Sequence, residues 1–482
     1  LRFSILFAVA LVPALARAEV SEASERPDEQ FDFMNLFAKK GLHDLVDERW
    51  NVYGQSTFIS SFKAPFVAKY TNLNGSNSSL LPGFEWSFTW TFTLLAGVKL
   101  WPGAEAYFAP EVVSEQPLSN LKGLGGAIQN FELQKSGSTV PTIYRSRLYL
   151  QQRFPLGGKR IEKTSDPQQL AGKTTSRRLV LRAGNFSVID FFDKNTYAGD
   201  LRQTFFNMAS LTYAAYDFVA DARGYSWGAM AELYWDDLAI RFGRFAPPLE
   251  PNSLALTFDY FKYYGDQAEL EYDWKIGKEH PGAVRVLGYR NVENMGRFDD
   301  AIAAFQQDPS KSAANCGTQY NYGSTNAGAP DMCWVRRSNQ KVGIGINLEQ
   351  TIAKDIGVFF RGMISDGHTE VYSFSSSDRS LSFGATAKGW PWRRPNDIAG
   401  IAVGLSFISD EHADYLRRGG VDGFIGDGAL NVAPESMLEA FYSFNLLSSL
   451  WLSIDYQHIT NPAYNADRGP VDIFGARAHA EF

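Results

Sequence analysis

Three arginines in residues 143–155 are spaced so that their guanidinium groups would share one side of an extended chain. In IYRSRLYLQQRF, Arg145, Arg147 and Arg153 have one parity, and Leu148 and Leu150 have the other. Side chains of a strand point alternately to opposite faces, so the spacing predicts one polar and one apolar face. A guanidinium is a planar fork of hydrogen-bond donors that suits both hydroxyls and carboxylates. The arginines could therefore bind a polyhydroxyl solute, or they could only brace the strand through ion pairs.

Further charged and polar side chains fall on the polar faces of other predicted strands. They are the cations Arg182, Arg241, Arg285 and Arg361, the acids Glu85, Glu105, Glu111, Glu232, Glu269, Glu271, Glu349, Glu435, Glu439 and Asp455, and the amides Gln151 and Gln457. Because both signs of charge are present, this surface would offer hydrogen-bond donors and acceptors together.

A polar and aromatic segment, residues 189–223, separates two of the predicted strands. Its polar residues include Asp190, Asp193, Asn195, Asp200, Arg202, Asn207, Asp217, Asp221 and Arg223, and its aromatic residues include Tyr197, Phe205 and Phe206. Sugars bind against aromatic faces while planar polar groups hold their hydroxyls, so the segment is a second candidate binding site. The same aromatic residues could instead anchor the segment to a protein wall.

The sequence gives little support to catalysis. The histidines form no H-E-x-x-H pair, and there is no G-x-S-x-G elbow, P-loop or calcium-binding EF-hand loop. Glu435 and Glu439 match a glycosidase pair in type, but on a strand they would lie about 13 Å apart, wider than either glycosidase mechanism uses. We therefore expect no enzymatic activity, no cofactor and no metal.

Residues 84–95, FEWSFTWTFTLL, alternate large apolar residues with polar ones. A soluble sandwich also alternates, because its inner faces are apolar. A transmembrane barrel alternates with lipid outside and a polar lumen inside. The body of the chain has no uninterrupted apolar run of about 20 residues, which argues against a helical membrane protein.

The period-two pattern predicts sixteen strands. They lie near residues 50–61, 84–101, 104–113, 143–155, 177–188, 224–236, 237–247, 266–277, 282–292, 340–353, 355–367, 378–389, 396–408, 434–446, 449–460 and 471–482. Tight turns alternate with long links, and only the link 156–176 departs, in the manner of an insertion. This alternation is typical of outer-membrane barrels. We predict an all-β fold: a closed antiparallel transmembrane β-barrel of about 16 strands, with an aqueous channel and with loop 189–223 folded into its lumen.

Both ends of the sequence point to export. LRFSILFAVALVPALARAEV has the features of a signal peptide, with Ala16-Arg17-Ala18 as the cleavage site. We therefore predict a signal peptide at 1–18, a periplasmic segment at 19–49 with a possible short helix, and the barrel at 50–482. The last strand ends on Phe482, which resembles the signal read by the barrel-assembly machinery of outer membranes. That machinery is a predicted partner.

Charge and cysteine content fit the same compartment. The formal net charge is -7, and without a basic tract this acidity argues against a nucleic-acid partner. Cys316 and Cys333 are the two cysteines, and both fall in a predicted loop. An oxidising compartment favours a disulfide between them, although two free thiols would also fit the sequence.

Several longer stretches resemble the carbohydrate-selective outer-membrane porins of Gram-negative bacteria. They are RLVLRAGNFSVIDFFDKNTYAGD (178–200), DLRQTFFN (200–207), DFVADARGYSWG (217–228), EQTIAKDIGVFFR (349–361) and the final DYQHITNPAYNADRGPVDIFGARAHAEF. The likeness spans roughly residues 50–482 and implies a sixteen-stranded barrel that passes sugars by diffusion. Better-known members carry Gly-Asp-Trp-Gly-Gly near their start, where this sequence has HDLVDERW, so the preferred sugar stays open.

We therefore expect an outer-membrane porin for passive, saccharide-preferring diffusion of small sugars. The main alternative is an outer-membrane secretion barrel for an exported polysaccharide, which would need a uniformly charged lumen. A surface-bound enzyme or a carbohydrate-binding module is a third possibility. The predicted partners are small saccharides, outer-membrane lipid and lipopolysaccharide, and the predicted assembly is a monomer or a homotrimer.

Overall fold

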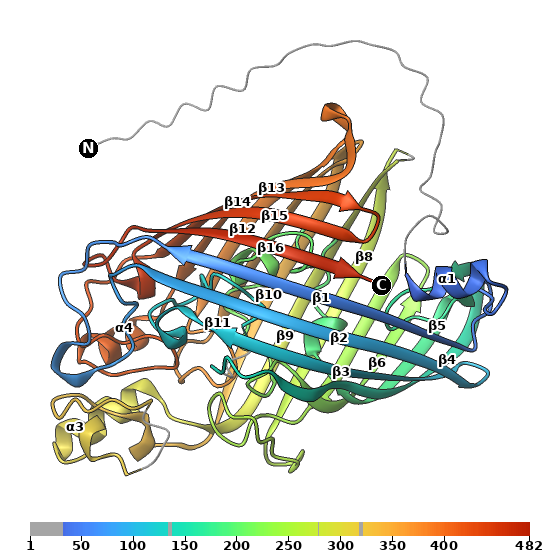
Figure 1. Ribbon diagram of the computed structural model, residues 1–482. Coiled ribbons are helices and arrows are strands. Elements are labelled where there is room, and N and C mark those ends of the chain that lie inside the picture. Colours follow the sequence, from blue (N-terminus) through green and yellow to red (C-terminus); the bar gives the residue numbers. More distant parts are fainter. Residues whose placement is uncertain (1–31, 134–136, 278, 318–321) are drawn as a thin grey trace.

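Sixteen strands form one closed barrel in the computed structural model, which describes residues 32–133, 137–277, 279–317 and 322–482 (Figure 1). Each strand pairs antiparallel with its neighbours along the chain, and β16 closes the barrel against β1. The predicted closed antiparallel barrel of about 16 strands is confirmed. The predicted signal peptide lies outside the described residues. The strands are β1 Trp50–Lys63, β2 Glu85–Trp101, β3 Ala104–Gln116, β4 Thr142–Lys163, β5 Gly172–Phe186, β6 Ser226–Trp235, β7 Leu238–Phe245, β8 Tyr264–Ile276, β9 His280–Met295, β10 Arg337–Ala353, β11 Ile356–Ser365, β12 Arg379–Gly389, β13 Arg394–Phe407, β14 Glu435–Leu447, β15 Leu450–Thr460 and β16 Val471–Glu481.

The alternation of the sequence separates an apolar outer face from a polar inner face. In β2, Trp86 is 40% exposed, whereas Thr89 on the opposite face is fully buried. Outer side chains pack across strands, as Phe58 of β1 does on Phe88 of β2, with ring centroids 6.0 Å apart. A lipid environment offers no partners for backbone N–H and C=O groups, so strands can cross it only when every edge is paired. Closure of the barrel meets that requirement.

The two ends of the barrel differ in their connections. Short turns such as Pro102-Gly103 and Asp236-Asp237 lie at one end, where β1 begins and β16 ends; we call this the turn end. Long links lie at the other end, the loop end. The helices are α1 Phe33–Lys39 at the turn end, α2 Met208–Leu211 between β5 and β6, and α3 Phe298–Gln307 and α4 Asp410–Arg417 at the loop end. In the described part of the chain, no helix is long and apolar enough to cross a membrane.

A buried histidine joins several loops at the loop end. His412 of α4 lies between two carboxylates, with Nδ1 2.9 Å from Asp378 Oδ2 and Nε2 3.2 Å from Asp422 Oδ2. Its ring stacks on Phe298 of α3, with centroids 4.3 Å apart. Burial alone would lower the pKa of His412, but the two carboxylates outweigh burial and raise the pKa to about 9. The loops therefore meet at an ion-pair cluster in which the His412 ring is protonated at neutral pH.

The link between β9 and β10 carries α3 and a disulfide. Cys316 and Cys333 are joined, with an S–S distance of 2.12 Å. Both cysteines lie in the link between β9 and β10, beyond the ends of these two strands.

The hairpin of β4 and β5 departs from the predicted boundaries. We expected a strand at 143–155 and an inserted link at 156–176, but β4 continues to Lys163 and β5 begins at Gly172. Most of the expected link is therefore an extension of the two strands beyond the turn end of the barrel.

Candidate functional site

The inner faces of β5 to β10 carry a network of paired charges. Arg241 of β7 lies at its centre: Nε is 3.0 Å from Glu232, and Nη1 is 2.8 Å from Glu269 and 3.0 Å from Glu271. Arg285 extends the network with Nε 2.5 Å from Glu271. Negative and positive side chains thus alternate from one strand to the next along the wall, because side chains at paired positions of neighbouring strands lie side by side. The network ends in further pairs, Arg182 with Glu232 and Arg285 with Glu349.

A second group of charges lines β3, β4 and the start of the link 187–225. Arg147 Nε and Nη2 donate to the two oxygens of Asp190, at 2.8 and 2.7 Å. Arg153 pairs with Glu105 of β3. Arg147 and Arg153 are each 13% exposed at the side chain. Both arginines are thus paired with a carboxylate and still reach solvent.

Arg145 does not join this group, which corrects the parity prediction. The register of β3 and β4 shifts between Ala109, which pairs with Arg147, and Pro110, which pairs with Arg145. This irregularity adds a residue to β4, so parity is broken between the two arginines. Arg145 is exposed, and its guanidinium lies 4.9 Å from the ring centre of Trp227. Met230 of β6 is buried on the inner face, and Trp227 has the opposite parity, so Trp227 lies on the outer face. Arg145, which contacts Trp227, therefore also lies on the outer face.

Residues 193–198 of the β5–β6 link contact the inner faces of β10 and β11. Arg361 Nε lies 3.0 Å from Asp193 Oδ1. Asn195 Nδ2 donates to Asn347 at 2.8 Å, and the backbone N–H of Thr196 donates to Glu349 at 2.6 Å. These bonds hold the first half of the link against one side of the barrel interior.

The second half of the link contacts β14 and β15. Glu439 accepts hydrogen bonds from the backbone N–H of Asn207 at 3.0 Å and from Ser210 Oγ at 2.5 Å. Asn207 Nδ2 donates to Gln457 at 2.8 Å, and Gln457 donates in turn to Asp455 at 2.8 Å. Glu439 is fully buried. It therefore acts as an acceptor for the link.

The aromatic residues of this link anchor it. Phe205 is fully buried and packs edge-on against Phe359 and Phe441, with centroids 5.6 and 4.9 Å away. Phe206 is also fully buried, and the guanidinium of Arg477 lies 4.4 Å from its ring centre. Of the two readings that the sequence left open for these two rings, the geometry matches anchoring.

The link between β3 and β4 also reaches inward-facing groups, which the sequence did not predict. The backbone N–H groups of Gly125 and Gly126 donate to Glu435 of β14 at 2.9 and 2.8 Å. Glu132 accepts from Thr91 at 3.1 Å and lies 3.3 Å from Arg202 Nε. Glu132 is nearly fully buried. The sequence gives no signal for Glu132, because the inward and outward alternation of a strand does not extend to a loop residue.

The remaining predicted residues lie nearer the loop end or between the two links. Arg202 also approaches Glu111, with 3.7 Å between Nη2 and Oε2. Asp221 caps its own turn by accepting from the N–H of Arg223 at 2.9 Å, and the guanidinium of Arg223 lies 4.5 Å from the ring centre of Tyr144. Glu85 accepts from Ser119 Oγ at 2.7 Å and holds the loop that follows β3.

Two polar cavities remain beside the β5–β6 link. One of about 210 Å³ is lined by Asp193, Lys194, Asn195 and Asp200. The other, of about 810 Å³, lies between Thr196 and Tyr197 of the link and Glu271, Arg285 and Glu349 of the wall. Pockets for small ligands have volumes of about 300–1,000 Å³, so the larger cavity is within that range. Lys194 lines the smaller cavity and is exposed to solvent, but it was not among the residues predicted from the sequence.

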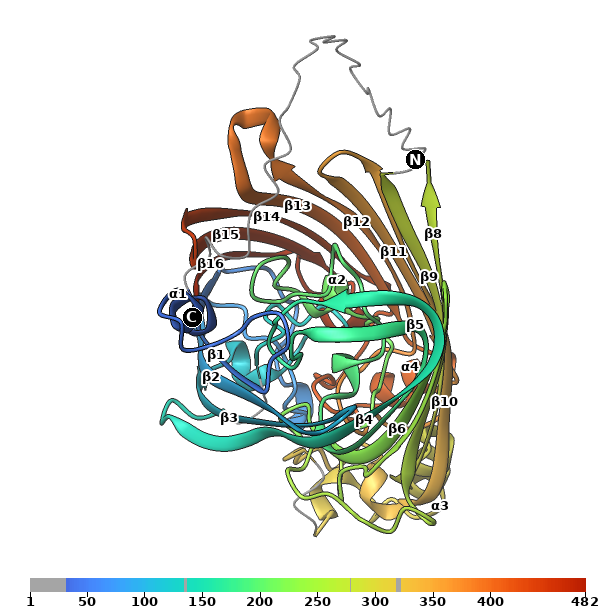
Figure 2. The same cartoon turned by 90° about the vertical axis from the view of Figure 1, so that its right-hand side faces the viewer.

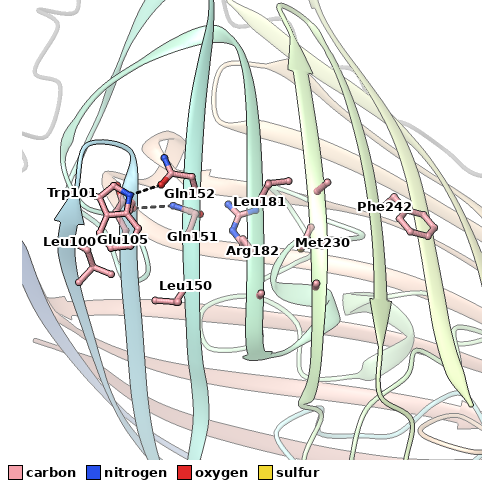
Figure 3. Close-up of a pocket in the computed structure, with 14 residues that line it drawn as sticks. Leu100, Trp101, Glu105, Leu150, Gln151, Gln152, Leu181, Arg182, Met230 and Phe242 are labelled. Carbon is pink, nitrogen blue, oxygen red and sulfur yellow. Dashed lines mark hydrogen bonds between the residues drawn. The ribbon is translucent and has the colours of Figure 1, made fainter. Parts of the chain in front are cut away.

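An apolar hollow lies on the other side of the wall. Its cavity of about 550 Å³ is lined by Leu150, Leu181 and Phe242, where Ala229 and Ala231 leave room (Figure 3). These residues belong to the outer face, whereas the neighbouring Gln151 donates to Glu105 at 3.0 Å on the inner face. The polar cavities, not this hollow, are thus the candidate site.

One family model and several solved structures are similar to this chain. The model of the carbohydrate-selective porin, OprB family, matches residues 79–482. OprB of Pseudomonas putida at high pH has a TM-score of 0.63 and 16% identity, covering 90% of this chain and 94% of that chain. DcaP, an outer-membrane channel of Acinetobacter baumannii, has a TM-score of 0.47 and 9% identity, covering 91% and 98%. No curated protein sequence matches the chain.

The family match covers most of the chain, and the P. putida structure has the same fold. The predicted resemblance to sugar porins, the outer-membrane location and the channel function are confirmed. Family and fold indicate a channel rather than an enzyme. The chain belongs to the OprB family of carbohydrate-selective porins, outer-membrane β-barrels through which sugars diffuse passively.

Proposed function

We propose that saccharides cross the barrel between the β5–β6 link and the charged wall of β3 to β10. The observation that carries this proposal is the pairing of cations with carboxylates on side chains that still reach solvent. Arg202, Arg147 and Arg153 are 28%, 13% and 13% exposed at the side chain. A sugar hydroxyl both donates and accepts hydrogen bonds, so it can use carboxylate acceptors and guanidinium donors in the same passage. An uncharged polyol therefore suits this lining.

The same pairing argues against the secretion barrel as the alternative. An exported charged polysaccharide would be guided by a lumen of one sign. Here Arg241 and Arg285 face Glu232, Glu269, Glu271 and Glu349 at close range. Such a mixed surface produces no long-range field of one sign. It favours small neutral solutes.

We also infer that Glu435 and Glu439 do not act as a catalytic carboxylate pair. The two acids that resemble a glycosidase pair each bind backbone N–H groups of links: Glu435 binds those of Gly125, Gly126 and Ala463, and Glu439 that of Asn207. Carboxylates that already accept several hydrogen bonds are poor candidates for general acids or nucleophiles.

The partners follow from the outer face and the last strand. We propose that the turn end faces the periplasm, that lipid and lipopolysaccharide surround the apolar wall, and that the barrel-assembly machinery reads the C-terminal strand. The ring of Phe482 contacts Phe92 of β2, with centroids 5.9 Å apart. Both a monomer and a homotrimer are compatible with this surface.

Liposome swelling tests the proposed function. Vesicles containing the purified barrel should swell faster in neutral monosaccharides than in zwitterionic or charged solutes of similar size. Equal rates for all these solutes would contradict a saccharide preference, and no swelling would contradict an open channel. Vesicles with heat-denatured protein provide the control.

A further inference from the structure

The hairpin of β4 and β5 bends sharply where it leaves the barrel wall. Its register shifts between Pro155 and Gly157 and again between Gly157 and Arg160. Gly157 and Gly158 have φ angles of +95° and +86°, a conformation that glycine adopts without steric cost. Figure 2, which faces the turn end, shows both strands curling from the wall across the mouth of the barrel. The bend directs the hairpin inwards.

The tip of the hairpin binds inward-facing side chains of β1. Asn51 Nδ2 donates to the carbonyl groups of Asp166 at 3.2 Å and of Gln169 at 2.9 Å. Tyr53 Oη donates to Ser165 Oγ at 2.7 Å. Asn51 is 2% exposed. Strand β1 therefore holds both sides of the tip.

Inward-facing side chains of β3 and β4 bind the same hairpin. The backbone N–H of Leu170 donates to Tyr107 Oη at 3.2 Å, and Lys163 Nζ lies 3.2 Å from Glu105. Tyr149 Oη donates to the side chain of Gln168 at 3.3 Å. Leu170 is 1% exposed. Since all these partners face inwards, the tip lies over the lumen.

Glu48, in the segment before β1, fastens the hairpin from the other side. Its carboxylate accepts from the backbone N–H of Ala171 at 2.7 Å and from Ser165 Oγ at 2.6 Å. His43 Nε2 lies 3.0 Å from it. The backbone N–H of Glu48 also donates to the carbonyl of Ala171 at 3.2 Å. An ionised carboxylate accepts strongly from such donors, so this contact fixes the hairpin in place.

Another hairpin at the turn end behaves differently. Trp392, between β12 and β13, donates from Nε1 to Tyr442 Oη at 2.7 Å. Tyr442 alternates with the buried Phe441 and lies on the outer face of β14. The turn of β12 and β13 thus leans outwards, which makes it a matched control for the inward hairpin.

We propose that residues 155–172 narrow the channel at its turn end, and that a saccharide leaving the lumen passes beside the tip of this hairpin. The inference rests on the proposed function of the interior as the sugar path. A cavity of about 320 Å³ beside the hairpin is lined by Glu48, Glu105, Arg153 and Lys163. The solute would therefore meet the same combination of hydrogen-bond donors and acceptors at the turn end as it meets in the barrel interior.

Removing the hairpin tests this inference. Residues 156–177 would be replaced by Asn-Gly, because Pro155 pairs directly with Arg178 and this dipeptide closes an antiparallel pair in two residues. The control replaces residues 390–393 by Asn-Gly between the paired Gly389 and Arg394. Single-channel conductance should rise in the first variant and stay at the wild-type value in the second. Block by a neutral disaccharide should weaken when the sugar is added at the turn end and persist at the loop end.

Unchanged conductance in a truncated barrel that still shifts on heated gels would overturn the proposed narrowing at the turn end. If the truncated chain fails to fold, E48L in the full-length protein takes its place. This substitution removes the acceptors of Ala171 and Ser165, so the current should alternate between two levels; one steady wild-type level would overturn the inference. If vesicles with the wild-type barrel do not swell in neutral saccharides, the proposed function fails, while the conductance comparison still decides the role of the hairpin.

Discussion

Two regions of the inner wall use the same residue type for different purposes. On β6 to β8, Glu232, Glu269 and Glu271 all pair with the guanidinium of Arg241. On β14, Glu439 accepts from the backbone of Asn207 and the hydroxyl of Ser210. All four glutamates face inwards and are buried. The first region mainly balances charge within the wall, although Glu269 also accepts from the backbone N–H of Asp193 at 2.8 Å, and the second fastens the link across the interior.

The difference shows that strand parity predicts a direction and not a role. A carboxylate opposite an arginine is partnered within the wall, and two such carboxylates, Glu269 and Glu349, also accept from backbone N–H groups of the link. A carboxylate without a neighbouring arginine needs other donors, and the exposed N–H groups of a link supply them.

The largest effect is expected from removing the centre of the charged wall. R241M leaves three buried carboxylates without their shared cation, and breaking a buried ion pair costs about 3–5 kcal/mol. The free energy of unfolding, measured by urea titration in detergent or lipid, should fall by that order. R244M is the control, because Arg244 pairs with Asp266 on the outer face and is 37% exposed at the side chain. An equal loss in both variants would contradict a special role for the inner network.

A smaller loss is expected when the anchor of the link is removed. In E439L, the N–H of Asn207 and the hydroxyl of Ser210 lose their acceptor, and an unsatisfied buried group costs about 1–3 kcal/mol. Proteolysis within residues 200–212 should also become faster, because the link loses its attachment. E439Q keeps one acceptor oxygen, so its free energy of unfolding and its rate of proteolysis should lie between those of wild type and E439L. Wild-type protease resistance in E439L would show that the aromatic contacts alone hold the link.

The sequence predicts most of the barrel because its period-two pattern is a direct consequence of a two-faced wall. It fails where local geometry breaks that period. The shifted register of Ala109 and Pro110 moves Arg145 to the outer face; Pro110 is a signal for the irregularity, because proline within a strand occurs at bulges, but it does not say which arginine is displaced. The role of Glu439 was also hidden, since its partners are hydrogen-bond donors of a distant link. Gly157 and Gly158 are a visible signal for the bend of the hairpin, but its direction depends on Asn51, Tyr53 and Glu48.

A local pH effect is expected at the loop end. The folded-state pKa of His412 is raised to about 9, above the unfolded value of about 6.5. Its contribution to stability is therefore complete below about 6.5 and is lost as the pH rises through about 9. Hydrogen exchange within residues 410–422 should speed up between pH 7 and pH 10, beyond the intrinsic rate. In H412Q, the exchange rate should rise with pH only as fast as the intrinsic rate. An acceleration as large as in the wild type would show that another group causes the pH effect.

Paired charges on the inner face are expected to line the path of permeation, and a comparison of variants of Arg147 and Arg145 tests this most directly. The two arginines are two residues apart, but one lies at 2.7 Å from Asp190 and the other lies over Trp227 on the outer face. In folded barrels, R147E should shift the reversal potential toward cation selectivity and weaken block by a neutral sugar, because a donor is replaced by an acceptor. R145E should leave both measurements at their wild-type values. An unchanged reversal potential and sugar block in R147E, or an equal shift in R145E, would contradict the account.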